Sequence, residues 1–252
     1  MALLRKQLLS SINSLLKPNE IKDFCPNGLQ VEGAEMINKI VTGVTASQAL
    51  IDAAIDVGAD TILVHHGYFW KGESQPIVGM KYKRIKSLLD NNLNLIAYHL
   101  PLDVHPLCGN NVQLGKLLQL NELSPVSGVK PSGIVYSGST PKSMSGEEVK
   151  SNLESSLNRD VLWVGGDSPI RSLAWCTGGG QGYIDAAIEA GVDGFITGEV
   201  SEQTVHTARE MGIHFFCAGH HATERYGVKS LGEWIAENHK IDVQFIDIPN
   251  PA

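Results

Sequence analysis

The chain lacks the cysteine patterns of small disulfide-stapled or zinc-stabilised proteins. Its 252 residues include four scattered cysteines, Cys25, Cys108, Cys176 and Cys217, and no CxxC pair. Zinc-thiolate sites and disulfide frameworks both need clustered cysteines. Neither is therefore indicated, and a reducing, cytoplasmic compartment is expected.

Long apolar runs are also missing. The N-terminal segment MALLRKQLLSSINSLLKP has apolar residues at helical spacing, but Arg5, Lys6 and Gln7 interrupt them. A secretory signal needs a continuous apolar centre, and a membrane-spanning helix needs about 20 apolar residues. We therefore expect a mature, soluble chain with no membrane partner.

The chain has fewer basic than acidic residues. The sequence has 20 Lys and Arg against 27 Asp and Glu, a formal net charge of -7. This balance argues against a nucleic-acid binder that neutralises phosphates over a broad basic face, although a local basic patch remains open. Hydrophobic content of 42% with 19% charged residues indicates a globular chain with a large core.

Common nucleotide-binding and nucleophile motifs are absent as well. TGGGQG at 177–182 stands between a strand-like and a helix-like run, where a phosphate can meet backbone N–H groups. It lacks the GK[ST] end of a P-loop, and a tight turn explains it about as well. No GxSxG elbow or cysteine-nucleophile motif stands out.

Helical and strand-like patterns alternate along the chain. Strand-like runs at 38–45, 59–67 and 92–101 are separated by helix-like runs at 46–58 and 81–92. Ser145 and Glu148 have capping-box spacing at the start of a later helix. This order predicts an α/β fold with mixed sheets flanked by helices.

The second half of the chain repeats features of the first. DAAIDVGAD at 52–60 and DAAIEAGVD at 185–193 agree at six of nine positions, and each is followed by a β-rich segment. The next strand-like runs each carry a histidine followed four residues later by a carboxylate. These coincidences predict an internal duplication, with one repeat at 1–128 and the other at 129–252.

Histidines gather where the strand-like runs end. Ligands of open α/β sheets bind at the carboxyl ends of strands, so three groups are expected to converge: His65–His66, His99 with Asp103, and His220 with Glu224. Neighbouring residues of a strand point to opposite faces, which favours one ion on each of His65 and His66 unless the turn at Gly67 reorients them. Two close ions need a bridging carboxylate.

Sequence spacing suggests a role for each carboxylate and separates candidate metal ligands from the other histidines. Glu224 lies one helical turn beyond His220 and is the candidate bridge, and Asp103 is the candidate terminal ligand. For His206, His214 and His239 a structural or solvent-facing role is favoured, whereas His105 and His221 stay ambiguous.

The motifs VHHGYFWKGE, AYHLPLDVHPLCGNN, ITGEVSEQ, AGHHATERYGV and FIDIPNPA together carry a family resemblance. The chain resembles the Nif-three-like dinuclear metal-centre family, whose members are often labelled GTP cyclohydrolase I type 2 homologs, in its short bacterial form. The resemblance implies two intertwined α/β repeats assembled as a toroidal homohexamer. It also implies that the metal ligands are His65, His66, Asp103, His220 and Glu224, with His99 nearer the second layer and Glu199 close to the site.

The chemistry that follows is metal-dependent hydrolysis, because two divalent ions lower the pKa of a shared water and polarise the group it attacks. In the reaction that the resemblance implies, hydroxide attacks C8 of the GTP guanine, opens the ring and releases formate. Glu224, His99 and His221 are the candidate catalytic residues. A two-metal phosphoesterase or nuclease and a non-catalytic metal-dependent scaffold remain alternatives, and Zn, Fe, Mn, Co and Ni all suit the ligands.

Overall fold

The computed structural model describes residues 2–252, which divide into two compact units. The first unit contains the residues up to Leu102 together with Gly227–Pro249, and the second contains Asp103–Tyr226 and Asn250–Ala252. The chain changes unit within two helices, α4 (Leu100–Asp103) and α10 (Arg225–His239), and a third time between Pro249 and Asn250. The expected repeats at 1–128 and 129–252 follow the sequence correspondence instead, and they and the duplication stay predictions.

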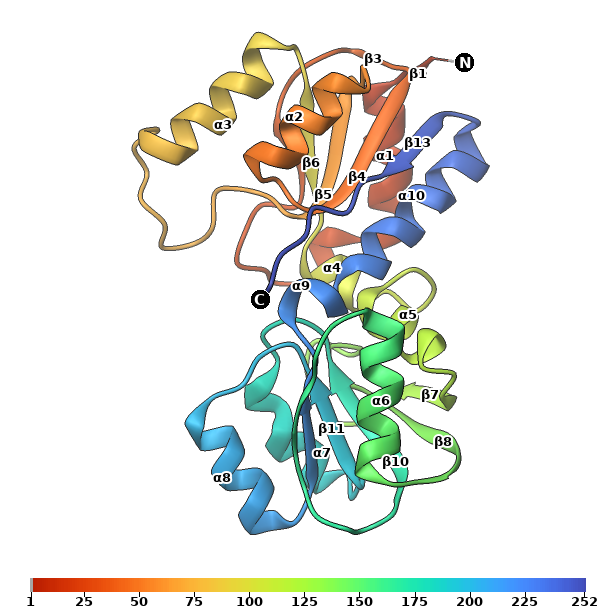
Figure 1. The fold of residues 1–252 in the computed structure, drawn as a ribbon. Helices are drawn as coiled ribbons and strands as arrows, with labels where there is room; N and C mark the ends of the chain where they lie inside the picture. Colours follow the sequence, from red (N-terminus) through yellow and green to blue (C-terminus); the bar gives the residue numbers. More distant parts are fainter. Residues whose placement is uncertain (1) are drawn as a thin grey trace. The chain divides into compact units, whose positions relative to one another are not determined.

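The first unit is built on a five-stranded mixed sheet with the order β13-β4-β5-β6-β2 (Figure 1). Strands β13, β4, β5 and β6 run parallel, and β2 runs antiparallel to β6 at the edge. A short pair of β1 and β3 stands apart from it. The strands are β1 Leu3–Leu4, β2 Gly28–Val31, β3 Met36–Ile37, β4 Lys39–Thr45, β5 Thr61–His66, β6 Asn94–Ala97 and β13 Asp242–Phe245.

Helices cover both faces of this sheet. On one face, α2 (Gln48–Asp56) and α3 (Gly79–Asp90) share an apolar core with alternate strand residues such as Val41, Ile62 and Val64. On the other face lies α10, whose Gly232 packs against Thr42. Helix α1 (Arg5–Leu16) lies on the same side as α10 in Figure 1. This two-sided cover explains the nearly continuous apolar runs of the parallel strands.

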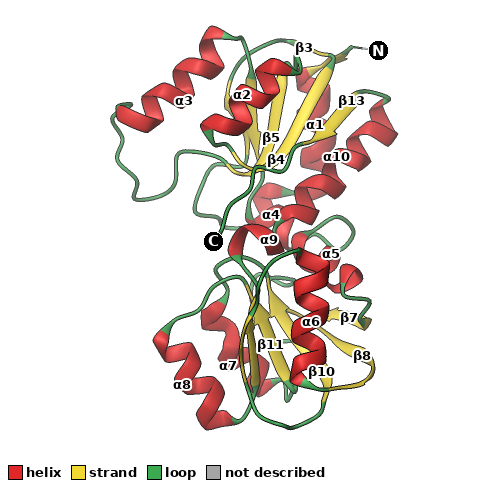
Figure 2. Ribbon diagram, in the orientation of Figure 1, coloured by secondary structure: helices red, strands yellow, loops and turns green. Residues whose placement is uncertain are grey.

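The second unit holds a six-stranded mixed sheet with the order β7-β8-β10-β11-β12-β9 (Figure 2). Its centre, β10, β11 and β12, is parallel, and the three outer strands pair antiparallel. The strands are β7 Asn121–Pro125, β8 Tyr136–Met144, β9 Leu162–Val164, β10 Ile170–Cys176, β11 Gly194–Thr197 and β12 His214–Cys217. The prediction of an α/β fold with mixed sheets and flanking helices is thereby confirmed.

The helices of the second unit also lie on both faces of their sheet. Helices α5 (Asn110–Leu117) and α6 (Gly146–Leu157) form one core with Trp175. The opposite face is covered by α7 (Ile184–Glu189) and α8 (Glu202–Met211), while η2 (Gln181–Tyr183) and α9 (His220–Thr223) are short turns. A further short turn, η1 (Pro18–Glu20), belongs to the first unit. The predicted capping box is confirmed: the Ser145 side chain accepts from the Glu148 N–H, and the Glu148 side chain accepts from the Ser145 N–H.

One expected boundary is wrong. The run at 92–101 was expected to continue as a strand to Pro101, but β6 ends at Ala97 and α4 begins at Leu100. Proline is well tolerated in the first turn of a helix, where its missing N–H has no partner to lose. The residues between β6 and α4 include His99.

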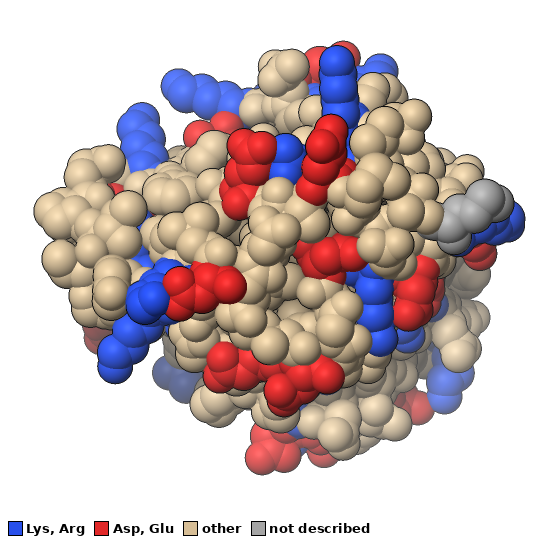
Figure 3. Space-filling view, turned by 90° about the horizontal axis from the view of Figure 1, so that it is seen from above, with Lys and Arg blue, Asp and Glu red and all other residues tan. Residues whose placement is uncertain are grey.

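Among the described residues, no helix combines the length and apolarity needed to cross a membrane. On the molecular face seen in Figure 3, acidic and basic side chains are interspersed. On that face, the described residues therefore present no extended basic stripe of the kind that follows a nucleic-acid backbone.

Candidate metal centre

The histidines of the first unit stand at the carboxyl ends of two neighbouring parallel strands. His65 and His66 are the last residues of β5, and His99 lies two residues beyond the end of β6. His65 is fully buried. This edge of a parallel sheet is where α/β proteins bind ligands, because loops diverge there while the strand ends stay fixed.

The three imidazole rings form one cluster. Ring centroids lie 4.5 Å apart for His65 and His66, 5.1 Å for His65 and His99, and 5.7 Å for His66 and His99. Each ring contributes one nitrogen to a group of three, and these three nitrogens all lie within 4.8 Å of one another. The two rings therefore lie closer than strand alternation alone would place them, next to the turn at Gly67 that follows β5. One ion on each of His65 and His66 stays a prediction.

Hydrogen bonds orient the rings of His65 and His66 and define which nitrogen of His65 can bind a metal. The Nδ1 of His65 lies 3.0 Å from the carbonyl oxygen of Tyr98, which can only accept, so this nitrogen carries the proton. The Nδ1 of His66 lies 3.2 Å from Oγ1 of Thr45. The carbonyl contact makes Nε2 of His65 the nitrogen with a lone pair for a metal. The Thr45 hydroxyl can donate or accept, so its contact orients the His66 ring without fixing the tautomer.

His99 is held by Asp23, a residue that the sequence analysis did not single out. Oδ1 of Asp23 lies 2.7 Å from Nδ1 of His99. The Trp70 ring stands edge-on to His99 with centroids 4.9 Å apart, which places one of the aromatics after the HHG motif against the histidine cluster. Since a single carboxylate in a loop carries no distinctive pattern, the sequence offered no signal for Asp23.

The second unit brings His220, Glu224 and Glu199 together at the carboxyl ends of β11 and β12. Nε2 of His220 lies 3.2 Å from Oε2 of Glu224, as their spacing of four residues predicts. Nδ1 of His220 lies 2.7 Å from Oε1 of Glu199. Glu199 therefore has a role that sequence reasoning left open: it engages Nδ1 and leaves Nε2 on the side of Glu224.

This environment favours a cation. Burial alone would lower the pKa of His220, but the hydrogen bonds and negative charges of Glu224 and Glu199 raise it to about 9. Glu224 is itself buried, with 3% of its surface exposed. In the ion-free chain a proton on His220 is the positive charge that balances these two carboxylates, and a divalent ion would supply that charge instead.

The glycines of TGGGQG allow a close approach to these side chains. A Cβ on Gly178 would lie 2.0 Å from Oε1 of Glu224, and a Cβ on Gly179 would lie 3.5 Å from the Glu199 carboxylate. Two carboxylates border this loop, so its electrostatic environment disfavours phosphate. Close packing against Glu224 explains Gly178, whereas a Cβ on Gly180 would meet Cys176 at 2.5 Å and one on Gly182 would meet nothing within 4 Å.

Asp103 is held at the same end of the second unit. Its Oδ1 accepts a hydrogen bond from Nδ2 of Asn110 at 2.8 Å, and Asp103 is 4% exposed. Burial, followed by the negative charges of Asp103 and Glu224, raises the pKa of the Cys176 thiol well above its ordinary value. In the ion-free chain the Cys176 thiol therefore stays protonated.

The expected site residues are divided between the units, with His65, His66 and His99 in the first and Asp103, His220 and Glu224 in the second. Each set fits a divalent metal ion by its chemistry: imidazoles tethered through Nδ1, and buried carboxylates beside an imidazole. Their joint action as one dinuclear ligand set stays a prediction.

The other histidines have separate surroundings. His214 is buried and accepts a hydrogen bond from Nε1 of Trp163, which confirms a structural role. The His206 side chain is 60% exposed, as expected for a solvent-facing position. His221 is buried in α9, and its proposed part in proton transfer stays a prediction.

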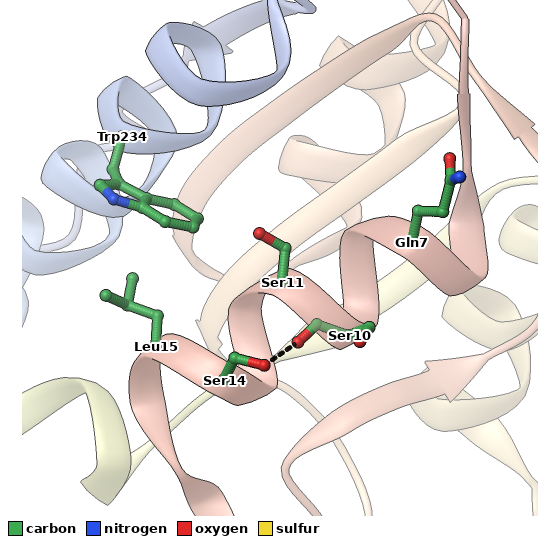
Figure 4. Close-up of a pocket in the computed structure, with 6 residues that line it drawn as sticks. All are labelled: Gln7, Ser10, Ser11, Ser14, Leu15 and Trp234. Carbon is green, nitrogen blue, oxygen red and sulfur yellow. Dashed lines mark hydrogen bonds between the residues drawn. The ribbon is translucent and has the colours of Figure 1, made fainter.

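A separate pocket of about 540 Å³ lies between α1 and α10 (Figure 4). Neither helix carries an expected site residue. Two of its serine hydroxyls have other partners, since Ser14 donates to the Ser10 carbonyl within α1 and Ser11 bonds to His239. The pocket therefore has few polar groups directed at a ligand, and the histidine clusters remain the candidate site.

Comparison with known proteins agrees with the motifs that define this site. The chain is 54% identical to a Pseudomonas aeruginosa protein over all of both chains, and 57% identical to a Haemophilus influenzae protein over 98% of each. Both relatives are called GTP cyclohydrolase 1 type 2 homolog.

Two solved structures share the fold over nearly the whole chain. The protein ybgI, described as of unknown function, superposes with a TM-score of 0.95 at 54% identity, covering 99% of this chain and 100% of that one. A protein from Thermus thermophilus follows with a TM-score of 0.90 at 30% identity and the same coverage. The family model Duf34/NIF3 (NGG1p interacting factor 3) matches residues 3–251, so the chain belongs to this family.

Proposed function

We propose that this protein is a metal-dependent hydrolase that uses two divalent ions, with His65, His66, Asp103, His220 and Glu224 as their ligands. The observation that carries the proposal is the shared tethering of the strand-end histidines. His65, His66 and His220 each engage Nδ1 with an oxygen of their own unit. Second-layer contacts of this kind are typical of metal-binding histidines, because they fix the ring orientation and raise the basicity of the ligating nitrogen.

The ions would lower the pKa of a bound water toward neutrality and polarise the group under attack. The residues of the chain supply orientation and proton transfer. Glu224, a buried carboxylate, accepts positive charge at the site, and Glu199 holds His220 toward it. His99 stands beside the two strand-end histidines with its Nδ1 already engaged, so its other nitrogen can accept a proton from water.

The proposed substrate is GTP. The names of the relatives support this choice, and two clusters of candidate metal ligands suit a hydrolytic ring opening. A first water would add at C8 of the guanine imidazole ring and open it to a formamide, and a second water would hydrolyse the formamide and release C8 as formate. The freed amine would then condense with the carbonyl of the rearranged ribose. This ring closure releases one water and gives dihydroneopterin triphosphate, with one water consumed overall.

The test is turnover of GTP by protein loaded with one metal at a time from the series Zn, Fe, Mn, Co and Ni. Formate release and pterin fluorescence should appear together and be lost in Glu224→Gln, which keeps the side-chain volume and removes the charge. Glu237→Gln, an exposed position of α10, is the matched control and should retain activity.

Phosphate release from GTP or shortening of an oligonucleotide, without formate, would refute the cyclohydrolase activity and favour a phosphoesterase. A metal-loaded protein inactive on all of these substrates would favour a non-catalytic scaffold. Equal activity of Glu224→Gln and Glu237→Gln would refute the assignment of Glu224.

We also propose that the chain forms a homohexamer, as its family resemblance implies. Light scattering on the purified protein should give six times the 27.2 kDa chain mass. A monomer or dimer at micromolar concentration would contradict this proposal without affecting the metal ligands.

A further inference from the structure

Asp23 is the centre of a hydrogen-bonded clamp in the first unit. Its carboxylate accepts four hydrogen bonds: from the Phe24 N–H at 2.6 Å, from Asn27 Nδ2 at 2.8 Å, from His99 Nδ1 at 2.7 Å and from the Leu100 N–H at 2.9 Å. Only 4% of its side-chain surface is exposed. Two of the four donors are His99 itself and the residue that follows it.

Asn27 completes the clamp from the same loop. Its side-chain oxygen accepts the His99 N–H at 2.8 Å, while its Nδ2 donates to Asp23. His99 is thus held through its backbone and its ring by two side chains more than 70 residues earlier in the sequence. Burial alone would raise the pKa of Asp23, but its hydrogen bonds with His99 and Asn27 outweigh burial and keep that pKa below its ordinary value.

We propose that Asp23 is a positioning residue that fixes His99 as the tautomer protonated on Nδ1, so that Nε2 presents its lone pair beside His65 and His66. An ionised carboxylate accepts hydrogen bonds only, so the proton of this contact belongs to the histidine. The inference deepens the proposed function by adding a residue to the same site. Only its catalytic consequence rests on the proposed function. The tautomer itself follows from the contacts of the first unit.

The same atoms could be taken for a separate metal site. Ligand atoms of Asp23, Cys25 and His99 lie within 4.8 Å of one another. However, both carboxylate oxygens of Asp23 already accept hydrogen bonds, and one of them binds the ring nitrogen of His99. Burial, followed by the negative charge of Asp23, raises the pKa of Cys25 to about 12. A protonated thiol beside a fully engaged carboxylate favours a clamp over an ion site.

A neutral His99 with its proton on Nδ1 can serve only as an acceptor at Nε2. That nitrogen accepts a hydrogen bond or a proton from a group beside His65 and His66. If Nε2 takes the proton of a water molecule, Nδ1 keeps its own, and the positive ring faces the negative charge of Asp23. The opposite tautomer would direct an N–H toward the site and could not accept. Asp23 therefore decides whether His99 can serve as a base.

The decisive experiment is long-range ¹H–¹⁵N NMR of the histidine side chains in ion-free, full-length protein, which distinguishes the two neutral tautomers. His99→Gln assigns the His99 signals by their loss. In the wild type with a neutral His99 ring, the signals of a proton on Nδ1 are expected. In Asp23→Asn, signals of the Nε2-protonated form or a mixture should replace them, because an amide NH₂ can donate to Nδ1.

Asp193→Asn is the matched control. Asp193 is a carboxylate that also accepts backbone N–H groups, but its hydrogen bonds come from Arg171 and Ser172, so the His99 signals should stay as in the wild type. A wild-type His99 protonated on Nε2 would overturn the inference, and so would an unchanged tautomer in folded Asp23→Asn. The wild-type measurement decides even if a variant fails to fold.

The catalytic consequence is measured separately. With GTP, Asp23→Asn should lower kcat by about 10- to 100-fold, the usual effect of losing an outer-layer partner, with KM little changed. Asp23→Glu should recover part of that loss if its carboxylate reaches Nδ1. If wild-type protein does not turn over GTP, the proposed function is refuted. The NMR measurement still tests the tautomer independently.

Discussion

Substitution of Gly178 offers a sharp test of the acidic cluster in the second unit. Gly178 has a φ of +66°, and a Cβ there would lie 2.0 Å from Oε1 of Glu224 and 3.1 Å from Nε2 of His220. Since ordinary contact begins at 3.4 Å, the carboxylate oxygen must move by about 1.4 Å in Gly178→Ala. The left-handed backbone adds about 1–2 kcal/mol of strain for alanine.

A matched control separates these two effects. Gly191 has a φ of +70° in the same unit, and a Cβ there would meet nothing within 4 Å. Both alanine variants should lose about 1–2 kcal/mol of unfolding free energy, or roughly 2–4 °C in Tm per kcal/mol. Only Gly178→Ala displaces Glu224. We therefore expect its divalent-ion affinity to fall about 10- to 100-fold, or about 1.4–2.7 kcal/mol, while Gly191→Ala binds as the wild type does.

Isothermal titration of each ion-free protein with Zn²⁺ or Mn²⁺, together with thermal unfolding, measures both quantities. Wild-type ion affinity in Gly178→Ala would refute the reasoning, because it would mean that Glu224 can move by more than 1 Å without loss of binding. A loss of affinity in Gly191→Ala as large as in Gly178→Ala would show that backbone strain, and not displacement of the carboxylate, is responsible.

Three further substitutions probe the second layer and the fold. Glu199→Gln should weaken divalent-ion binding about 10- to 100-fold in the same titration, because a neutral amide oxygen holds Nδ1 of His220 less strongly than a carboxylate does. The exposed Glu202→Gln should leave ion binding unchanged. Asp193→Asn should lower the unfolding free energy at neutral pH, where the backbone and hydroxyl hydrogen bonds that hold its pKa below 3.8 outweigh burial. Because a depressed carboxyl pKa stabilises the fold above the unfolded-state value, the difference from wild type in denaturant titrations should shrink as pH falls below about 3.8. Tyr98→Phe should lower the unfolding free energy by about 1 kcal/mol, because the hydrogen bond from the Tyr98 hydroxyl to Asn13 of α1 is lost. The same variant should leave ion affinity unchanged, because His65 contacts the carbonyl of residue 98 and not the hydroxyl. A weaker ion affinity in Tyr98→Phe, no change in Glu199→Gln, or a pH-independent deficit in Asp193→Asn would contradict these expectations.

Local patterns in the sequence were enough to place most elements around the site. The β-branched run before His65 predicted β5, and the capping-box spacing of Ser145 and Glu148 predicted the start of α6. The contact of His220 with Glu224 also follows from a spacing of four residues. These features depend on neighbours along the chain, so periodicity and residue type carry the information.

Placement of the rings could not be predicted in the same way. Alternation along a strand suggested opposite faces for His65 and His66, but their rings lie 4.5 Å apart because the strand ends there. The end of β6 at Ala97 likewise leaves His99 outside the strand. Strand alternation fixes the direction of Cβ only while the strand continues.

The sequence by itself determined the fold class, the strand-end histidines and the carboxylates near them, because each depends on local pattern and residue chemistry. Tertiary structure alone decided which nitrogen of each histidine is tethered. Asp23 reaches His99 from 76 residues away, and Glu199 reaches His220 from 21. A hydrogen bond depends on distance and direction in space. The folding of loops and sheets brings these partners together, and no local sequence pattern indicates the pairing.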